Sequence, residues 1–260
     1  MRVNAPDERT AAGIEAIAPT AGQPMKPLRT MHYDIEINGH GLVILEQGDV
    51  VGRVDGPEAA RDLVYIRTHR RAFELASLVG WVRVHAALVD IGGRRVLVAG
   101  RSGVGKTTLA VRLLVDGHAV QGDESVLVRA GTAIAVPRPL HVEADGASLV
   151  PELAPLLPRL PRVEGTAVLD PGRCGFGWQL REAPLDHVVL LGRDPGAPSC
   201  RRAAQTEAMT ALVPEVFPVT ETKRVLLGEL TAALAGVAVW RLSVGEPAAM
   251  RAALLDVVER

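Results

Sequence analysis

One stretch of the chain has the residue types and the spacing of a phosphate-binding loop. Residues 100–107 read GRSGVGKT, which fits the pattern GxxxxGK[ST]. Glycines let successive backbone N–H groups converge on phosphate oxygens, the lysine contacts the β and γ phosphates, and the threonine hydroxyl suits Mg²⁺. The candidate nucleotide-binding residues are Gly100, Ser102, Gly103, Val104, Gly105, Lys106, Thr107 and Thr108. The alternative is a glycine-rich turn that binds nothing.

The elements around this loop favour phosphate binding over a plain turn. The apolar strand VLVA, residues 96–99, precedes the loop, and the helical pattern TTLAVRLLVD follows it and stops at Gly117. Lys106 is one of only three lysines, so its position in the motif is informative. The sequence leaves open the roles of Arg173 and Arg181, either of which is a candidate for phosphate contact or for the solvated surface.

An acidic pair follows the loop after one helix and one strand. Asp123 and Glu124 come after the short strand HAVQG, and paired carboxylates there suit general-base and metal-ligand roles. Which of the two is the base stays open, and the alternative is a hydrated turn. Asp194 is a looser candidate, because Gly192 and Arg193 lie between it and the end of the apolar strand in HVVLLGRD.

His85 is the third candidate. The segments RVHAALVDI and RRVLVAG are predicted to form a hairpin around Gly92-Gly93, and the second strand leads into the loop. His85 lies on the first strand, so it is placed to reach the same cleft. The alternative is a hydrogen-bonded core histidine.

With these elements in order, residues 82–128 resemble the catalytic domain of HPr kinase/phosphorylase and its kinase-only relatives. The resemblance rests on Val84-His85, the loop 100–107, Gly117-His118 and Asp123-Glu124, and PRPLH at 137–141 is similar to the related-kinase group. It implies an α/β P-loop domain of the phosphoenolpyruvate-carboxykinase-like type.

The resemblance also implies roles for the site residues. Asp123 would be the general base that takes the proton of a serine hydroxyl, with His85 orienting it and Lys106 on the phosphates. Thr107 and Glu124 would hold Mg²⁺. The implied activity is an ATP- and Mg²⁺-dependent kinase that transfers the γ-phosphate to a serine of a protein or small ribosomal peptide.

Two departures from the family narrow this expectation. The phosphorylase signature Glu-Val-Arg-Gly has no clear counterpart, since PRVEGTAV at 161–168 has Val163, Glu164 and Gly165 without an arginine between the last two, so we expect no reverse dephosphorylation. The N-terminal region is shorter than the family's regulatory domain, so HPr itself is not the expected substrate. A small-metabolite kinase and a non-catalytic nucleotide sensor remain alternatives.

The 260 residues are divided into three regions by their patterns. Residues 1–30 have no periodicity and are expected to form a mobile arm. Residues 31–80 are predicted to form a small β unit, with turns at Asn38-Gly39 and Gly48-Asp49, followed by a helix. Residues 81–260 are assigned to the P-loop kinase domain.

The predicted helix runs from Pro57 to about Gly80. Its expected apolar face is Leu63, Ile66, Phe73, Ala76 and Val79. Its expected solvent-facing charges are Arg67, His69, Arg70 and Arg71. Between residues 137 and 161, six prolines favour short helices or a packed loop, a candidate lid. The chain then returns to α/β alternation, with a closing helix from about Pro247.

Composition excludes several partners. A formal net charge of −1 lacks the positive field of a nucleic-acid binder. Every apolar run is too short to span a membrane, and no signal-peptide pattern follows the first residues. Cys174 and Cys200 fit neither a disulfide framework nor a zinc site, which favours a cytoplasmic location. The expected partner is the protein or peptide substrate, and homo-oligomerisation is left open.

Overall fold

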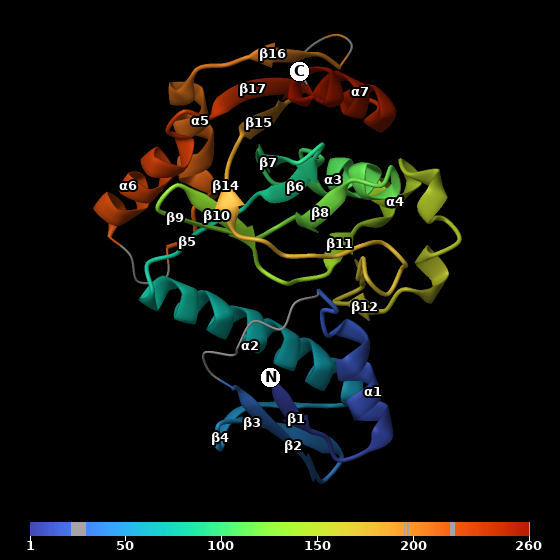
Figure 1. Ribbon diagram of the computed structural model, residues 1–260. Helices are drawn as coiled ribbons and strands as arrows, with labels where there is room; N and C mark the ends of the chain where they lie inside the picture. Colours follow the sequence, from blue (N-terminus) through green and yellow to red (C-terminus); the bar gives the residue numbers. More distant parts are fainter. Residues whose placement is uncertain (22–29, 195, 197, 219–221, 260) are drawn as a thin grey trace.

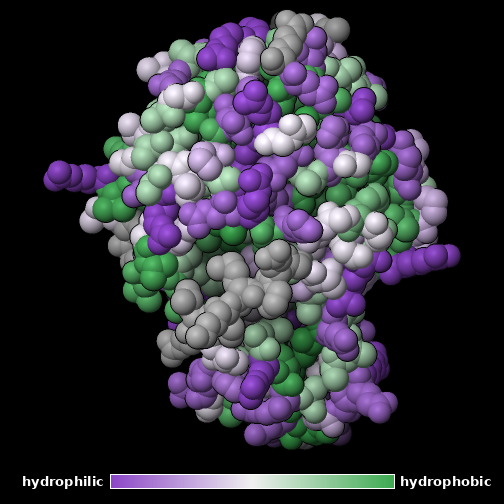
Figure 2. Space-filling view, viewed as in Figure 1, coloured by the Kyte–Doolittle hydropathy of each residue, from purple (hydrophilic) through white to green (hydrophobic). Residues whose placement is uncertain are grey.

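The computed structural model describes residues 1–21, 30–194, 196, 198–218 and 222–259. It is a mixed α/β structure whose described residues form four sheets, one in a smaller part and three in a larger part (Figure 1). The α/β class expected from the sequence is confirmed at this level. No helix among the described residues is long and apolar enough to cross a bilayer. Hydrophilic residues are spread over both parts on the face shown in Figure 2.

The smaller part is a four-stranded sheet packed against two helices. The strands are in the order β1-β2-β3-β4 and span Arg2–Asn4, His32–Asn38, Gly41–Glu46 and Asp49–Val54. The helices are α1, Glu8–Ile17, and α2, Pro57–Leu78. Glycines with positive φ at Gly39 and Gly48 lie in the turns between the antiparallel strands β2, β3 and β4. The hairpins predicted at these glycines are confirmed.

The first 21 residues contain regular elements that the sequence pattern did not predict. β1 pairs in parallel with β2. α1 is capped by Asp7, whose side chain accepts a hydrogen bond from the Thr10 backbone N–H at 2.7 Å, and it buries Thr10, Ile14 and Ile17. The expectation of no regular structure is wrong here, because a buried face that includes threonine gives a weak apolar pattern. Residues 22–29 of the predicted arm lie outside the described residues.

Helix α2 begins and ends where the sequence predicted, but the face that it buries is only partly the predicted one. Pro57 occupies its first turn, and Gly80, with a φ of 84°, follows its end. Ile66 of the predicted apolar face is 45 % exposed. The buried residues are Ala60, Val64, Tyr65, Phe73 and Ser77. Phe73 is buried as predicted, but alanine, serine and tyrosine add little to an apolar count, so the pattern did not indicate the other buried residues.

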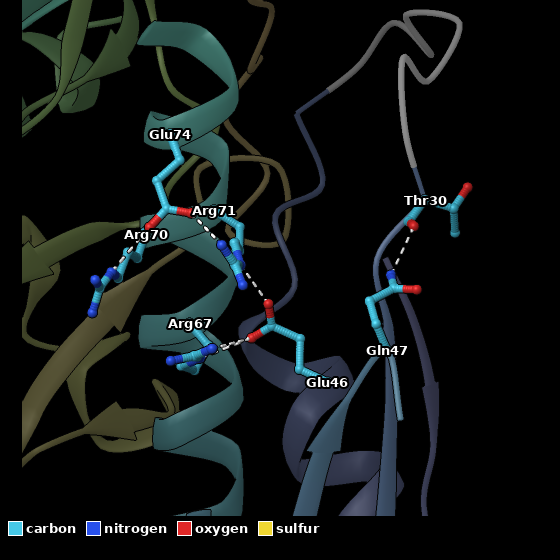
Figure 3. A network of polar contacts seen from close by, with 7 residues as sticks. All are labelled: Thr30, Glu46, Gln47, Arg67, Arg70, Arg71 and Glu74. Atoms are coloured by element: carbon cyan, nitrogen blue, oxygen red, sulfur yellow. Dashed lines mark hydrogen bonds and ion pairs between the residues drawn. The ribbon is translucent and has the colours of Figure 1, made fainter. Parts of the chain in front are cut away.

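Two arginines of α2 bind β3, although the sequence predicted that they face water. The Glu46 side chain is 3 % exposed and accepts hydrogen bonds from Arg67 Nε at 2.8 Å and Arg71 Nε at 2.5 Å (Figure 3). Arg70 pairs with Glu74 of its own helix instead. Burial raises the pKa of Glu46, but the hydrogen bonds from Arg71 and Arg67 outweigh burial and lower it. These ion pairs hold α2 on the sheet.

The larger part is built on a six-stranded sheet with the order β16-β17-β15-β7-β6-β8. Its strands are Ala87–Ile91 (β6), Arg94–Ala99 (β7), Ala119–Gly122 (β8), His187–Gly192 (β15), Cys200–Arg202 (β16) and Ala238–Ser243 (β17). β7, β15 and β17 are parallel neighbours, and the other three strands are antiparallel to theirs. The accompanying helices are Lys106–Val115 (α3), Gln205–Leu212 (α5), Lys223–Leu234 (α6) and Pro247–Val258 (α7).

Alternate residues of the central strands enter two separate cores. Val96 and Val98 of β7 pack in the core that includes α3 and α7, whereas Leu97 and Ala99 pack in the core that includes α5 and α6. Successive strand residues point to opposite faces, so the sheet is covered on both sides. This burial explains why β7 and β15 are near-continuous apolar runs.

The predicted strand that contains His85 is divided between two sheets. β5, Val82–Val84, pairs with β9 in a second sheet, whereas β6 pairs with β7 as predicted. That sheet has the order β14-β10-β9-β5, with β9, β10 and β14 at Val126–Arg129, Thr132–Ala135 and Ala183–Pro184. His85 lies in the connection, so its predicted place on the hairpin strand is wrong. The continuous apolar pattern hides the crossing because both strands bury a face.

The proline-rich segment packs as short elements, as predicted. It contains β11, Leu140–Val142, the short helix α4, Ala144–Ser148, and the 3₁₀ turns η1, Pro151–Leu153, and η2, Leu157–Arg159. β11 joins β13, Thr166–Leu169, and β12, Arg162–Val163, in a third sheet. A further 3₁₀ turn, η3, spans Val213–Glu215. Val150 and Leu153 are buried in the core that includes α3, which fixes this segment beside the loop.

Candidate active site

The loop between β7 and α3 has a backbone that requires glycine. Gly100, Gly103 and Gly105 have φ of 155°, 71° and 109°, a region that other residues rarely enter. At Gly100 a Cβ would also lie 3.0 Å from the backbone oxygen of Leu191. The N-terminus of α3 has no side-chain cap. Its first backbone N–H groups are therefore available to an anion held by the loop.

Lys106 is the first residue of α3 and is only 5 % exposed. Its Nζ donates hydrogen bonds to the backbone oxygens of Gly100 at 2.6 Å and Arg101 at 3.2 Å. Burial lowers the pKa of Lys106, and the nearby carboxylates of Glu215, Asp123 and Glu124 oppose that shift. The loop thus encloses a buried ammonium group whose present partners are carbonyls of the loop itself.

Asp123 lies directly after β8 and contacts the start of α3. Thr107 Oγ1 donates a hydrogen bond of 2.8 Å to Asp123 Oδ2, and Asp123 is 2 % exposed. Burial, helped by the neighbouring Glu124 carboxylate, raises the pKa of Asp123 to about 7, while the Thr107 hydrogen bond opposes the shift. A carboxyl group with a pKa near neutrality is suited to accept and return a proton.

Glu124 points to a different partner. Its side chain forms an ion pair with Arg138, which comes from the proline-rich segment just before β11. The two carboxylates of the acidic pair therefore have distinct surroundings, one beside a hydroxyl of α3 and one beside a guanidinium. This difference is compatible with separate roles for the two carboxylates, one as general base and one as metal ligand, which the sequence left unassigned.

His85 is held by its backbone. Its N–H donates to the backbone oxygen of Glu215 at 2.8 Å, and its ring meets Phe217 edge-on with centroids 6.1 Å apart. Burial lowers the pKa of His85, and Lys106 lowers it further. No hydrogen bond joins His85 to Asp123 in the described chain, so its role of orienting Asp123 stays a prediction.

These side chains meet at one cavity of about 490 Å³. The predicted site residues that line it are His85, Ser102, Gly103, Val104, Gly105, Lys106, Thr107, Thr108, Asp123 and Glu124. Gly100 instead lines a neighbouring cavity of about 340 Å³. Asp194 lines neither cavity, and its carboxylate pairs with Arg241 Nε at 2.7 Å. The acidic pair 123–124, and not Asp194, is therefore the one beside the loop.

The sequence missed residues of α2 and of the segment around β11 that line or adjoin the cavity. His141, Glu143 and Asp145 line it, and Tyr65 and Arg138 contact His141 from behind. The only signal was the segment PRPLH, which contains Arg138 and His141 but indicated no role. Nothing in the pattern of α2 marked Tyr65. His69, predicted to face water, packs against the Tyr65 ring with centroids 4.3 Å apart.

The remaining candidates lie elsewhere. Arg173 Nη2 donates to the backbone oxygen of Glu15 at 2.6 Å, and Arg181 lies 3.6 Å from an oxygen of Asp90. Neither arginine lines the cavity of the loop. Cys174 and Cys200 are free thiols.

The oxygen donors beside the loop suit Mg²⁺, which needs few protein ligands, better than a metal ion whose ligands all come from the protein. Within the described ranges no cluster of three or more histidine, cysteine, aspartate or glutamate residues forms a metal site. Mg²⁺ is usually bound by one or two protein oxygens and completes its shell with phosphate oxygens and waters. The Thr107 hydroxyl and the carboxylates of Asp123 and Glu124 in one cavity supply such a donor set.

Comparison with known proteins finds sequence similarity to HPr kinase/phosphorylases. No family model matches the chain. It is 37 % identical over 87 residues to the HPr kinase/phosphorylase of Peptoclostridium acidaminophilum, covering 34 % of this chain and 24 % of that protein. With the HPr kinase/phosphorylase of Clostridium acetobutylicum it shares 27 % identity over 118 residues, covering 43 % of this chain and 34 % of that protein.

Among solved structures, the HPr(Ser) kinase/phosphatase from Coxiella burnetii matches with a TM-score of 0.36 and 14 % identity, over 67 % of this chain and 94 % of that one. The sequence match spans only about a quarter to a third of these curated relatives. Over that part the chain is similar to HPr kinase/phosphorylases, and the resemblance predicted from its motifs is confirmed.

Proposed function

We propose that this protein is an ATP- and Mg²⁺-dependent kinase that transfers the γ-phosphate to a serine hydroxyl of a protein or small ribosomal peptide. The observation that carries the proposal is the hydrogen bond between Thr107 and the buried carboxyl of Asp123, in the cavity that Lys106 also lines. Groups suited to bind phosphate and to accept a proton thus lie together. The similarity to HPr kinase/phosphorylases supports the choice of a kinase.

The loop and Lys106 would bind the phosphates of ATP. The backbone N–H groups of the glycine-rich turn and of the first turn of α3 suit the phosphate oxygens. Lys106 Nζ would exchange its present acceptors, the oxygens of Gly100 and Arg101, for β- and γ-phosphate oxygens. This exchange costs little geometric change, because the lysine already lies inside the loop.

Asp123 would act as the general base. As the serine Oγ forms its bond to the γ-phosphorus, the bond from that phosphorus to the bridging oxygen of ADP breaks, and the hydroxyl proton passes to Asp123. A pKa of about 7 lets Asp123 be ionised for this step and protonated after it. His85 lines the same cavity and would orient the acceptor or the base.

Thr107 and Glu124 would hold Mg²⁺ between them and the nucleotide. When bound, the ion neutralises charge on the transferred phosphoryl group. The all-oxygen donor set supports this assignment. The alternative is that Glu124 is the base and Asp123 holds the ion. The experiment below distinguishes the two assignments.

We also propose the phosphoenolpyruvate-carboxykinase-like type of P-loop domain, which the antiparallel pair β6–β7 directly before the loop supports.

We propose that phosphate is transferred in one direction only, from ATP to the acceptor. The segment nearest to the phosphorylase signature has Glu164 and Gly165 in the tight turn between β12 and β13, without the arginine. Free thiols at Cys174 and Cys200 agree with the predicted cytoplasmic location.

The test is to compare nucleotide affinity with transfer from γ-labelled ATP in Lys106→Ala, Asp123→Asn and Glu124→Gln, with peptides encoded beside the gene as acceptors. We expect Lys106→Ala to lose both by orders of magnitude. Asp123→Asn should lower transfer by roughly 10² to 10⁴ and change nucleotide affinity much less. If Glu124 is the base, Glu124→Gln gives the selective loss and Asp123→Asn weakens binding in Mg²⁺.

Asp194→Asn is the matched control, because that carboxylate lies outside the cavity. It should leave nucleotide affinity and transfer unchanged. Full transfer in both Asp123→Asn and Glu124→Gln would overturn the proposed base. Nucleotide binding without transfer to any hydroxyl would identify a sensor, and transfer only to a small hydroxylated compound would identify a metabolite kinase.

A further inference from the structure

A polar network lies behind the cavity and connects helix α2 to the acidic pair. Arg138 binds Glu124 through Nη1, and its Nε donates to the Tyr65 hydroxyl at 2.8 Å. The Tyr65 hydroxyl also lies 2.7 Å from His141 Nε2, and Arg138 Nη2 lies 3.3 Å from the same nitrogen. Tyr65 is buried, and its ring stacks on that of His141 with centroids 5.7 Å apart.

The donors and acceptors of this network determine where His141 carries its proton. A guanidinium group donates only, so the Tyr65 oxygen accepts from Arg138 and directs its own proton to His141. His141 Nε2 therefore faces two donors, the Tyr65 hydroxyl and Arg138 Nη2. A nitrogen that accepts hydrogen bonds carries no proton, so the neutral ring is protonated at Nδ1.

His141 Nδ1 is available to a ligand. Within the described chain Nδ1 forms no hydrogen bond. It is also not fully buried, so a ligand can reach it. His141 also lines the cavity that contains the loop and the acidic pair. Burial lowers the pKa of His141 to about 4, helped by the positive charge of Arg138, so the ring stays neutral at physiological pH.

We infer that Tyr65 is a positioning residue of the active site: its hydroxyl fixes His141 as a neutral Nδ1–H donor to an oxygen of the phosphate chain, and it holds Arg138 against Glu124. This inference rests on the proposed kinase function for the identity of the ligand. A phosphate oxygen suits the donor because it is a strong acceptor, and the cavity of His141 is the one that the loop lines.

The inference makes the smaller part necessary for the geometry of the site. Tyr65 belongs to α2, which is attached through Glu46 to β3 of the N-terminal sheet. The phosphate loop and the acidic pair come from the larger part. The site is therefore completed across the junction between the two parts, by a side chain that touches no substrate itself.

The first test reads the tautomer directly. The full chain, with ¹⁵N-labelled histidine, is examined by long-range ¹H–¹⁵N correlation spectra, and the His141 signals are assigned with a His141→Gln variant. We expect one neutral tautomer protonated at Nδ1, and a selective shift of Nδ1 when Mg²⁺ and the non-hydrolysable analogue AMP-PNP are added. A ring protonated at Nε2, or a Nδ1 signal that ignores the nucleotide, would overturn the inference.

The second test separates positioning from folding. Tyr65→Phe should lower kcat for transfer about tenfold, the effect of one hydrogen bond of about 1.4 kcal/mol, and should shift the His141 Nε2 signal. Tyr33→Phe is the matched control, because Tyr33 is the only other tyrosine and lies in the core of the N-terminal sheet. It should change neither kcat nor the His141 signals.

Substitutions at His141 complete the design. His141→Asn keeps an amide N–H near the place of Nδ1 and should keep most of the transfer, whereas His141→Ala should lose at least tenfold. Adding Tyr65→Phe to His141→Ala should cost less than the tenfold that Tyr65→Phe costs alone, because the part of its effect that passes through His141 is already lost. Independent, multiplying losses would overturn the inference. If wild-type protein transfers no phosphate, the proposed function fails, while the tautomer and nucleotide spectra still decide the role of Tyr65.

Discussion

Asp123 is buried beside another carboxylate, and this arrangement has a cost in folding free energy. Its pKa of about 7 in the folded chain lies above the ordinary 3.8, chiefly because of burial and then because of Glu124. An acid whose folded pKa is raised binds its proton more tightly in the native state. Its contribution to stability is therefore lost as pH rises from about 4 to about 7.

This cost can be measured without nucleotide or Mg²⁺. Asp123→Asn removes the titration and keeps an oxygen that can accept the hydrogen bond from Thr107. Between pH 5 and pH 7, we expect the free energy of unfolding of the wild type to fall by about 2 to 3 kcal/mol relative to the variant. The measurement is urea-induced unfolding of both proteins at each pH, so that other titrating groups cancel in the difference.

Asp194→Asn provides a control of opposite sign. A hydrogen bond from Arg241 lowers the pKa of Asp194, so its ionised form stabilises the fold above its unfolded pKa, and that stability is lost as pH falls through the lower folded pKa. The variant should gain nothing over the wild type between pH 5 and pH 7. Parallel stability curves for Asp123→Asn and wild type would contradict the raised pKa of Asp123.

Among single residues of the site, the sequence predicted those that belong to a local motif or lie close to one in the chain. The loop glycines, Lys106 and Thr107 form one motif, and Asp123 follows it by a short helix and strand, so their convergence could be predicted. Tyr65 and Arg138 could not, because their contacts join segments far apart in the chain and neither has a motif. The tautomer of His141 depends on both of them.

Helix α2 connects the two parts of the molecule. Its 22 residues contact β3 and β4 in the smaller part and β5 in the larger one. Arg67 and Arg71 bind the buried Glu46, while Tyr65 faces His141. We therefore expect neighbouring arginines of this helix to contribute differently to the free energy of unfolding, although they form one charged run in the sequence.

Replacing single arginines of α2 by alanine should show this difference. Arg67→Ala leaves the 3 % exposed Glu46 carboxylate with one partner instead of two, and we expect a loss of about 1 to 3 kcal/mol in the free energy of unfolding. The Arg70 side chain is 70 % exposed and pairs with Glu74 on its own helix, so Arg70→Ala should change stability by less than about 0.5 kcal/mol. Urea titrations at neutral pH give both values, and equal losses would refute the distinction.

Boundaries of elements could be predicted better than the faces they bury. Pro57, Gly39, Gly48 and Gly117 act through backbone geometry, which is local and therefore visible in the sequence. The face of α2 depends on which small or polar residues meet a neighbour. Likewise, the crossing at His85 is decided by hydrogen bonds of β5 to β9, a strand beyond the loop and α3.

At the scale of the whole molecule, a buried carboxylate of the larger part binds the segment that follows α1. Asp170, which follows β13 and is 3 % exposed, accepts hydrogen bonds from the Thr20 backbone N–H at 2.8 Å, from Thr20 Oγ1 at 2.5 Å and from the Arg173 N–H at 3.0 Å. Arg173 in turn donates to the backbone oxygens of Glu15 and Ala18 at the end of α1. No local pattern could predict this contact, since Thr20 and Asp170 lie 150 residues apart in the chain.

Breaking this contact should release α1 while the main sheet stays folded. Asp170→Ala leaves three donors without their acceptor, and we expect a loss of about 2 kcal/mol in the free energy of unfolding. Amide hydrogen exchange should then speed up in residues 8–21 and remain slow in β7 and β15, because those strands are buried on both faces. Mass spectrometry of peptic fragments measures both regions in one experiment.

A second substitution reaches the same contact from the other side and guards against a variant that fails to fold. A Cβ at Gly172 would collide with Thr20 Oγ1, and Gly172 has no positive φ that alanine would strain. Gly172→Ala should therefore displace Thr20 and speed exchange in α1 with Asp170 intact. Gly177, where a Cβ would meet nothing within 4 Å, supplies the control Gly177→Ala, with exchange as in the wild type. If α1 exchanges no faster in either Asp170→Ala or Gly172→Ala, its attachment comes instead from the apolar contacts of Ile14 and Ile17, which these changes leave in place.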